Sequence, residues 1–380
     1  FNKTLALQPI NLYALATYSL IRYLRPVKFL PKKLVAPQLA DLEPYQSARR
    51  IGGQGQVYLN ANELPFTPFG MPTGETWQRY PDFLPQELAK HYAGYLKIET
   101  SKVVAVRGAD EGIDLLIRTF CQPGIDLIRI QTPTYSMYEF IANAHQVAVE
   151  SIPLTTDFDL TMAANLKPQQ NLKIIFICNP NNPTGNLLPA ADILGIADQH
   201  KEDALVVVDE AYSEFCPDQS LVSEIANHPN LVILRTLSKA FGLAAIRLGF
   251  IVADESILEY VSTLIAPYPI PDPSARIGIE ALSVDGLSFM AKQRDTSLAL
   301  KKKYKEIMAA LPMVQNVYPS HANFFLVHFQ DSTKVFEWLC QNGIILRDQN
   351  RVNTLENHLR ISIGSEQEMD AMINCLKEFS

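Results

Sequence analysis

The strongest constraint on the fold is a series of short apolar runs separated by segments with helical patterning. Five of these runs are VVAV (103–106), LIRI (127–130), KIIFIC (173–178), ALVVV (204–208) and LVIL (231–234). Apolar strands that alternate with helices form a parallel sheet covered on both faces. The predicted fold class is therefore α/β, with a mostly parallel central sheet.

Each apolar run ends in a polar segment that is rich in turn residues. These segments are RGADEG (107–112), QTPTY (131–135), NPNNPTG (179–185), DEAY (209–212) and RTLSK (235–239). In an open parallel sheet, ligands bind at the carboxyl ends of the strands. We therefore expect the five segments to meet at one ligand-binding edge.

The chain of 380 residues is long enough for two domains. Beyond residue 254 we predict a long charged helix (295–311), short strands at 322–329, 343–348 and 358–364, and a final helix from Glu366. We assign residues 81–290 to a large ligand-binding domain and residues 291–380 to a small C-terminal α+β domain.

Residues 1–40 contain no acidic residue and six basic ones, Lys3, Arg22, Arg25, Lys28, Lys32 and Lys33. Such composition occurs in transit peptides. It also occurs in an extension of uncertain order, which is the interpretation that we favour.

Charge and cysteine content exclude several classes of function. The net charge of −7 gives no overall basic field for nucleic acid. Five scattered cysteines without a CxxC pair argue against disulfides or a metal cluster and predict a cytoplasmic protein. No apolar run approaches the ~20 residues of a membrane helix.

Two residues at the predicted edge have side chains suited to catalysis. Lys239 follows a buried strand and is flanked by hydroxyls, which suits an amine nucleophile, although a solvated basic loop would look similar. Asp209 follows an apolar β-branched run, where a carboxylate is costly to bury without a cation. It is either the N-cap of a helix or the partner of a protonated ring nitrogen, with Tyr212 on the same helical face as a hydroxyl donor.

The other polar segments supply groups for a phosphate and an aromatic ring. The RGADEG turn presents backbone N–H groups at a helix start, where phosphate binds without a positive side chain. Arg247, Thr236 and Ser238 add side-chain donors. Asn182 offers an amide and Tyr135 a flat ring. This inventory suits pyridoxal 5′-phosphate.

The chain also resembles a known family along residues 41–380. The matching segments are PYQSARR, LNANE, RYPD, RGADEGIDLLIR, PTYSMY, NPNNPTG, VVVDEAY, LRTLSKAFGLAAIRLGF, APYPI, GIILRD and LRISIG. In the order and spacing of these segments, the chain is similar to the fold-type I, class II aminotransferases. Among these enzymes it most resembles the histidinol-phosphate aminotransferases.

The resemblance implies roles for individual residues. Lys239 would bind the cofactor covalently, Asp209 would pair with its ring nitrogen, and Asn182 and Tyr212 would hold its ring oxygen. The phosphate would be held by Ala109, Asp110, Thr236, Ser238 and Arg247, and by Tyr80 of a second subunit. Residues 41–80 would then form an arm that joins the small domain and contacts the partner of a homodimer.

The resemblance also implies the substrates. Tyr45, Arg347 and Arg360 would bind the phosphate of L-histidinol phosphate, with Asn182 nearby. 2-Oxoglutarate would accept the amino group, giving imidazole acetol phosphate and L-glutamate in histidine biosynthesis. An aromatic amino acid aminotransferase, a phospho-amino-acid decarboxylase and a cofactor-sensing regulator remain as alternatives. His321 departs from the family pattern and could alter the substrate pocket.

Overall fold

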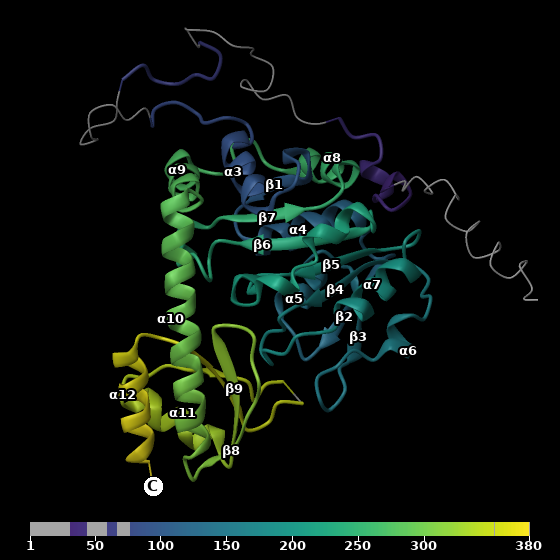
Figure 1. Cartoon of the computed structure of the whole chain (residues 1–380). Helices are drawn as coiled ribbons and strands as arrows, with labels where there is room; N and C mark the ends of the chain where they lie inside the picture. The colour runs from purple at the N-terminus through teal and green to yellow at the C-terminus, as the bar shows by residue number, and fades with distance from the viewer. Residues whose placement is uncertain (1–30, 44–58, 67–76, 353, 380) are drawn as a thin grey trace, which may run out of the picture.

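The computed structural model describes residues 31–43, 59–66, 77–352 and 354–379. A seven-stranded sheet forms its centre (Figure 1), in the order β1-β7-β6-β5-β4-β2-β3. The strands are β1 (Val103–Val106), β2 (Leu127–Thr132), β3 (Ala148–Pro153), β4 (Leu172–Cys178), β5 (Leu205–Asp209), β6 (Leu231–Thr236) and β7 (Gly249–Val252). β7 is antiparallel to both neighbours, and the other pairs are parallel. The predicted α/β fold class is confirmed.

Helices cover both faces of this sheet and bury its apolar side chains. On one face lie α4 (Ala109–Phe120), α5 (Met137–Ala144) and α8 (Glu255–Leu264). On the other lie α3 (Gln86–Leu96), α7 (Ala190–Gln199) and α9 (Asp272–Ala281). The sequence of α4 explains why it packs on the sheet. Its buried residues recur at helical spacing and form one apolar stripe: Ile113, Leu116, Ile117 and Phe120.

A second, four-stranded antiparallel sheet lies at the far end of the molecule, in the order β10-β11-β9-β8. Its elements are β8 (Val314–Val317), β9 (Phe324–Phe329), β10 (Arg347–Asp348), β11 (His358–Ser362), α11 (Ser332–Gln341) and α12 (Glu366–Lys377). The helix α10 (Val284–Ala309) runs from beside α9 to this small sheet (Figure 1), so one helix spans both domains.

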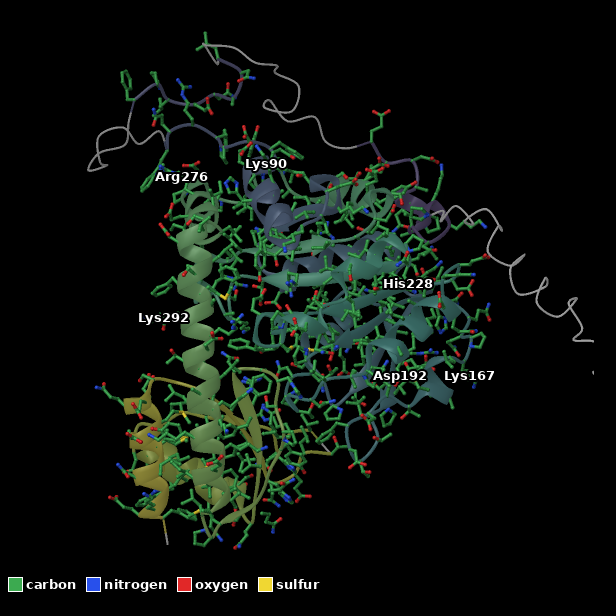
Figure 2. All side chains as sticks on the ribbon, in the orientation of Figure 1. Lys90, Lys167, Asp192, His228, Arg276 and Lys292 are labelled. Atoms are coloured by element: carbon green, nitrogen blue, oxygen red, sulfur yellow. The ribbon has the colours of Figure 1, made fainter. Side chains whose placement is uncertain are left out.

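Shorter helices fill the connections between these elements. They are α6 (Met162–Asn165), η2 (Pro31–Lys33), η3 (Pro37–Leu39), η4 (Thr100–Lys102), η5 (Ser213–Phe215), η6 (Pro217–Gln219), η7 (Val222–Ala226) and η8 (Ala244–Ile246). Charged side chains such as Lys90, Lys167 and Lys292 are exposed around the outside (Figure 2). Within the described ranges, no helix combines the length and apolarity needed to cross a membrane.

Several predicted bounds differ from the structure. α10 begins at Val284, where the hydroxyl of Ser283 caps it, so the boundary predicted at residue 290 falls inside a continuous helix. The helix expected after Asp209 is only the short η5. Of the strand predicted at 343–348, only Arg347–Asp348 pairs with a neighbouring strand. Part of the predicted extension, Leu34 and Val35, is buried against the large domain.

Candidate active site

A cavity of about 310 Å³ lies at the carboxyl ends of the central strands. Eleven of the residues predicted for the site line it: Ala109, Asp110, Tyr135, Asn182, Asp209, Tyr212, Thr236, Ser238, Lys239, Arg247 and Arg360. Cys178, Ala211 and Ala244 also line it and were not predicted. The edge on which the polar segments were expected to meet is therefore a real cavity.

Asp209, the last residue of β5, is a buried carboxylate held by two neutral donors. The Tyr138 hydroxyl donates to its Oδ2 at 2.7 Å, and the backbone N–H of Ala211 donates to its Oδ1 at 3.1 Å. Burial raises the pKa of Asp209 from 3.8 to about 6, because neither donor offsets the loss of water. A cation in the cavity would favour the ionised form of Asp209 further and lower its pKa.

Lys239 lies in the turn that follows β6 and faces Tyr212. Its Nζ is 5.6 Å from the centre of the Tyr212 ring. Burial lowers the pKa of Lys239, and the positive charge of Arg360 lowers it further. A larger fraction of the amine is therefore neutral near pH 7, as a nucleophile or a base requires.

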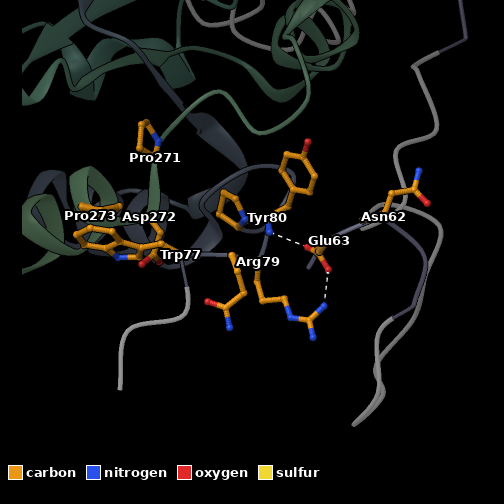
Figure 3. A pocket seen from close by; sticks show the side chains of 11 residues that line it. Asn62, Glu63, Trp77, Arg79, Tyr80, Pro271, Asp272 and Pro273 are labelled. Atoms are coloured by element: carbon orange, nitrogen blue, oxygen red, sulfur yellow. Dashed lines mark hydrogen bonds and ion pairs between the residues drawn. The ribbon is translucent and has the colours of Figure 1, made fainter. Parts of the chain in front are cut away.

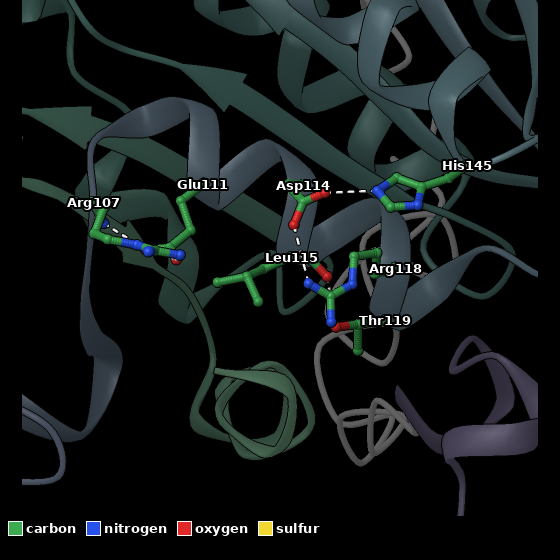
Figure 4. Close-up of polar contacts among 7 residues, drawn as sticks. All are labelled: Arg107, Glu111, Asp114, Leu115, Arg118, Thr119 and His145. Carbon is green, nitrogen blue, oxygen red and sulfur yellow. Dashed lines mark hydrogen bonds and ion pairs between the residues drawn. The ribbon is translucent and has the colours of Figure 1, made fainter. Parts of the chain in front are cut away.

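The first turn of α4 forms one wall of the cavity beside Arg247. Gly108, with φ +85°, is the N-cap and has no side chain to bind the first N–H groups of the helix. Arg247 lies against it, since a Cβ on Gly108 would be 2.7 Å from Nη2 of Arg247. Glu111 accepts from the backbone and the guanidinium of Arg107 (Figure 4), which fixes the entry into α4.

Hydroxyl groups extend this wall. The Thr236 hydroxyl is 2.9 Å from Oγ of Ser238, and the Tyr135 hydroxyl donates to Oδ1 of Asp110 at 3.0 Å. Together with Arg247 and the N-terminus of α4, the hydroxyls of Thr236 and Ser238 give the cavity a set of polar groups suited to a phosphate.

Arg360 enters the cavity from β11 of the small sheet. Its Nη1 donates to Oδ1 of Asn182, and its buried Nε has no hydrogen-bond partner among the described residues. Arg347 lies directly opposite Arg360 in the β10–β11 register, so both side chains are on one face. Burial lowers the pKa of Arg360, and the charge of Arg347 lowers it further. Two like charges on one face favour an anion between them.

Three predicted residues do not line this cavity. Arg347 is exposed beside it. Tyr80 lines a second cavity of about 520 Å³, where its N–H donates to Glu63 at 2.7 Å (Figure 3) and its ring stacks on Tyr268. Tyr45 lies outside the described residues.

Known proteins match most of the chain. Residues 57–376 match the family model for class I and II aminotransferases. The chain belongs to the class I and II aminotransferases. It is 42% identical over 337 residues to histidinol-phosphate aminotransferase 1 of Haemophilus influenzae (strain 86-028NP), a match that covers 89% of this chain and 96% of that protein. The predicted family resemblance is confirmed.

Solved structures of aminotransferases share the fold. The histidinol-phosphate aminotransferase from Clostridium acetobutylicum has a TM-score of 0.73 and 25% identity, over 79% of this chain and 90% of that chain. The histidinol-phosphate aminotransferase from Sinorhizobium meliloti, in complex with pyridoxal-5'-phosphate, also has a TM-score of 0.73, at 21% identity, over 80% of this chain and 84% of that chain.

The aminotransferase site contains supporting residues that the sequence analysis missed. Tyr138 binds Asp209 from α5, three residues after Tyr135. The amide of Asn181 donates to the carbonyl of Pro133 at 2.9 Å and accepts from Thr134 at 2.8 Å, which ties the two turns that carry Tyr135 and Asn182. Tyr138 is the second tyrosine of PTYSMY and Asn181 is the first asparagine of NNPTG, so both lie in segments that the sequence marks. Neither segment indicates which residue they bind.

We expect Asp209→Asn to stabilise the ligand-free aminotransferase at pH 8, by on the order of 2 kcal/mol in the free energy of unfolding. Asp209 has a folded pKa of about 6, above its ordinary 3.8, so the folded wild type binds more protons than the unfolded chain between those values. Wild-type stability therefore rises as pH falls through about 6, and the advantage of Asn shrinks. Urea denaturation of the wild type and the Asn variant at pH 8 and pH 5 measures the difference in the free energy of unfolding at each pH. Exposed Asp203→Asn is the control, and an Asn variant no more stable than wild type at pH 8 would contradict the expectation.

Proposed function

We propose that the chain transfers the amino group of L-histidinol phosphate to 2-oxoglutarate, giving imidazole acetol phosphate and L-glutamate in histidine biosynthesis (EC 2.6.1.9). The observation that carries the substrate assignment is a pair of arginines on one face of the small sheet: Arg360 lines the cavity, and Arg347 lies opposite Arg360 in the β10–β11 register. Arginine binds phosphate and carboxylate oxygens in a bidentate manner. One site could thus bind the phosphate of the amine and a carboxylate of 2-oxoglutarate in turn.

We propose pyridoxal 5′-phosphate as the cofactor, and the cavity fits it. The buried Asp209 has only neutral donors of its own, which leaves it suited to a protonated ring nitrogen. Tyr212 and Asn182 would hold the ring oxygen, and Tyr135 would stack on the ring. The phosphate would occupy the wall formed by Ala109, Asp110, Thr236, Ser238 and Arg247. When bound, the cofactor supplies an electron sink for charge that develops on the substrate carbon.

Lys239 has two roles in this proposal. Its neutral amine would bind the cofactor covalently in the resting enzyme. With Nζ free, its neutral amine would act as the general base toward the proton on the carbon that bears the amino group, and the protonated Nζ would then serve as the general acid of the reaction. Asp209, ionised, would keep the ring nitrogen of the cofactor protonated, and that positive charge would stabilise the negative charge left when the carbon loses its proton.

Asn182 and Arg360 orient the substrate in this proposal. Nη1 of Arg360 donates to Asn182, which fixes the guanidinium. Its buried Nε has no hydrogen-bond partner among the described residues and can bind a substrate anion. An anion bound by Arg360 and Arg347, and by Tyr45, would place the amino group of the substrate toward Lys239. In this proposal the enzyme recognises its substrate by the phosphate group. An aromatic aminotransferase would have no such group to bind.

We also propose that the working unit is a homodimer in which Tyr80 reaches the cofactor phosphate of the partner. Tyr80 lies away from Lys239 in its own chain, and neighbouring Leu64, Phe66 and Trp77 are exposed apolar side chains. Such a surface is typical of a contact between subunits. Sedimentation at catalytic concentrations should give the dimer mass, and a fully active monomer would contradict this assignment. The cytoplasmic location stays a prediction.

The direct test of the function is a substrate panel with the wild-type enzyme. We expect glutamate formation from histidinol phosphate and 2-oxoglutarate with kcat/KM about a hundredfold above that for phenylalanine or tyrosine, because the aromatic acids lack the phosphate. Carbon dioxide release from a phospho-amino acid would indicate the decarboxylase instead. Binding of the cofactor without turnover of any amine would indicate a regulator.

A variant pair separates the phosphate contact from general effects of charge. Arg347→Met should raise KM for histidinol phosphate about tenfold, since it removes a charge-assisted contact. Arg351→Met, an exposed arginine four residues on, should leave KM unchanged. Equal KM values for the two variants would contradict the role of Arg347.

A further inference from the structure

Lys301 is a half-buried lysine of α10 that binds the backbone of a turn in the small domain. Its Nζ donates to the carbonyls of Ser320 and Ala322, at 2.7 and 2.6 Å. The Lys301 side chain is half-buried, and this burial lowers the pKa of its amine to about 8. The turn it holds, residues 320–322, contains the His321 that departs from the family pattern. We call this segment the 320–322 turn.

The 320–322 turn rests on the large domain at Gly185. The N–H of His321 donates to the carbonyl of Gly185 at 2.7 Å. A Cβ on Gly185 would lie 2.5 Å from Oγ of Ser320, so the two segments are in close contact. Gly185 ends the same turn that carries Asn182. The position of the 320–322 turn is thus tied to the position of Asn182.

The residues that follow the turn reach the cavity. Ala322 is fully buried in an apolar cluster with Tyr212 and Phe324, against which Leu298 of α10 packs. The Phe324 ring meets the Tyr212 ring edge-on, with centroids 5.2 Å apart, and Cζ of Arg360 lies 5.4 Å from the centre of the Phe324 ring. A shift of the turn would therefore move the aromatic ring on which Arg360 rests.

We propose that Lys301 is a positioning residue for the substrate anion: by holding the 320–322 turn on Gly185, it sets where Arg360 stands relative to Asn182. The role rests on the proposed function, because it concerns the same anion site. Lys301 itself lines neither described cavity. It acts through two carbonyls, a turn and Phe324, so its loss should weaken substrate binding more than it slows the proton transfer at Lys239.

The test is steady-state kinetics of the holoenzyme with histidinol phosphate and 2-oxoglutarate. Lys301→Met, which keeps the length of the side chain but removes the donor, should raise KM for histidinol phosphate about tenfold and change kcat less than about threefold. The neighbouring exposed Lys302→Met is the matched control and should behave as wild type. A KM for histidinol phosphate that Lys301→Met leaves unchanged, with or without a loss of kcat, would overturn the proposal.

A second variant keeps the proposal testable if the Met variant does not fold. Lys301→Arg retains the charge and the donors but does not lose its proton near pH 8. The titratable neighbours of Lys301 are Cys216 after η5, Lys305 on α10 and His321 in the turn. Loss of the proton above about pH 8 leaves two N–H groups on Nζ but removes the charge that strengthens both hydrogen bonds, so wild-type KM should rise relative to the Arg variant as pH increases from 7 to 9. A flat ratio would overturn the proposal.

Failure of the proposed function gives a different result. Wild-type enzyme that does not act on histidinol phosphate contradicts the function itself. The same variants are then compared with glutamate as the amino donor, whose carboxylates would use Arg360. A KM for glutamate that Lys301→Met leaves unchanged would overturn the positioning role independently.

Discussion

The ionisation of one buried carboxylate, Asp209, governs the rest of the site. A carboxylate at the end of an apolar strand is stable in its charged form only if a cation or strong donors compensate for the lost water. The protein supplies Tyr138 and one backbone N–H, which hold the orientation of Asp209 and still leave its pKa raised. The cationic ring of the proposed cofactor would meet the remaining requirement, and the other residues of the cavity surround the place where that ring would lie.

The parallel sheet explains why residues far apart in the chain meet here. Asp209 ends β5, while Tyr135, Asn182 and Lys239 follow β2, β4 and β6, and neighbouring parallel strands end at the same edge. The small domain adds Arg360 across this edge, and its hydrogen bond to Asn182 joins the two domains at the cavity. In the proposed function, the residues that bind the cofactor would thus belong to the large sheet, and the choice of substrate anion would belong to the small one.

The sequence was sufficient for the parallel sheet and for most of the cavity, because both depend on local patterns. Five apolar runs and the polar segments after them specify the strands and their ends. β3 was missed because it is an edge strand whose residues are mostly not buried, so no apolar run marks it. The early start of α10 was missed because Gly286 interrupts the helical pattern, and the cap at Ser283 is visible only in the structure.

Partners across the fold could not be predicted from one sequence. Nothing in the sequence links Tyr138 to Asp209 or Lys301 to the carbonyls of the 320–322 turn, since these contacts depend on how α5 and α10 pack. The helix expected after Asp209 gave way to η5 because Glu210 turns inward to an ion pair with Arg235. Long-range polar contacts of this kind are set by tertiary packing, while the residue types at the strand ends are local.

In the proposed function, Lys239 is the covalent anchor of the cofactor at this sheet edge. The most direct test is reduction of the resting holoenzyme with borohydride, followed by proteolysis and mass spectrometry of the peptides. We predict that the mass of the reduced cofactor appears on the peptide that contains Lys239 and is lost in Lys239→Ala. A label on another lysine, or no reducible bond in an active enzyme, would contradict the account.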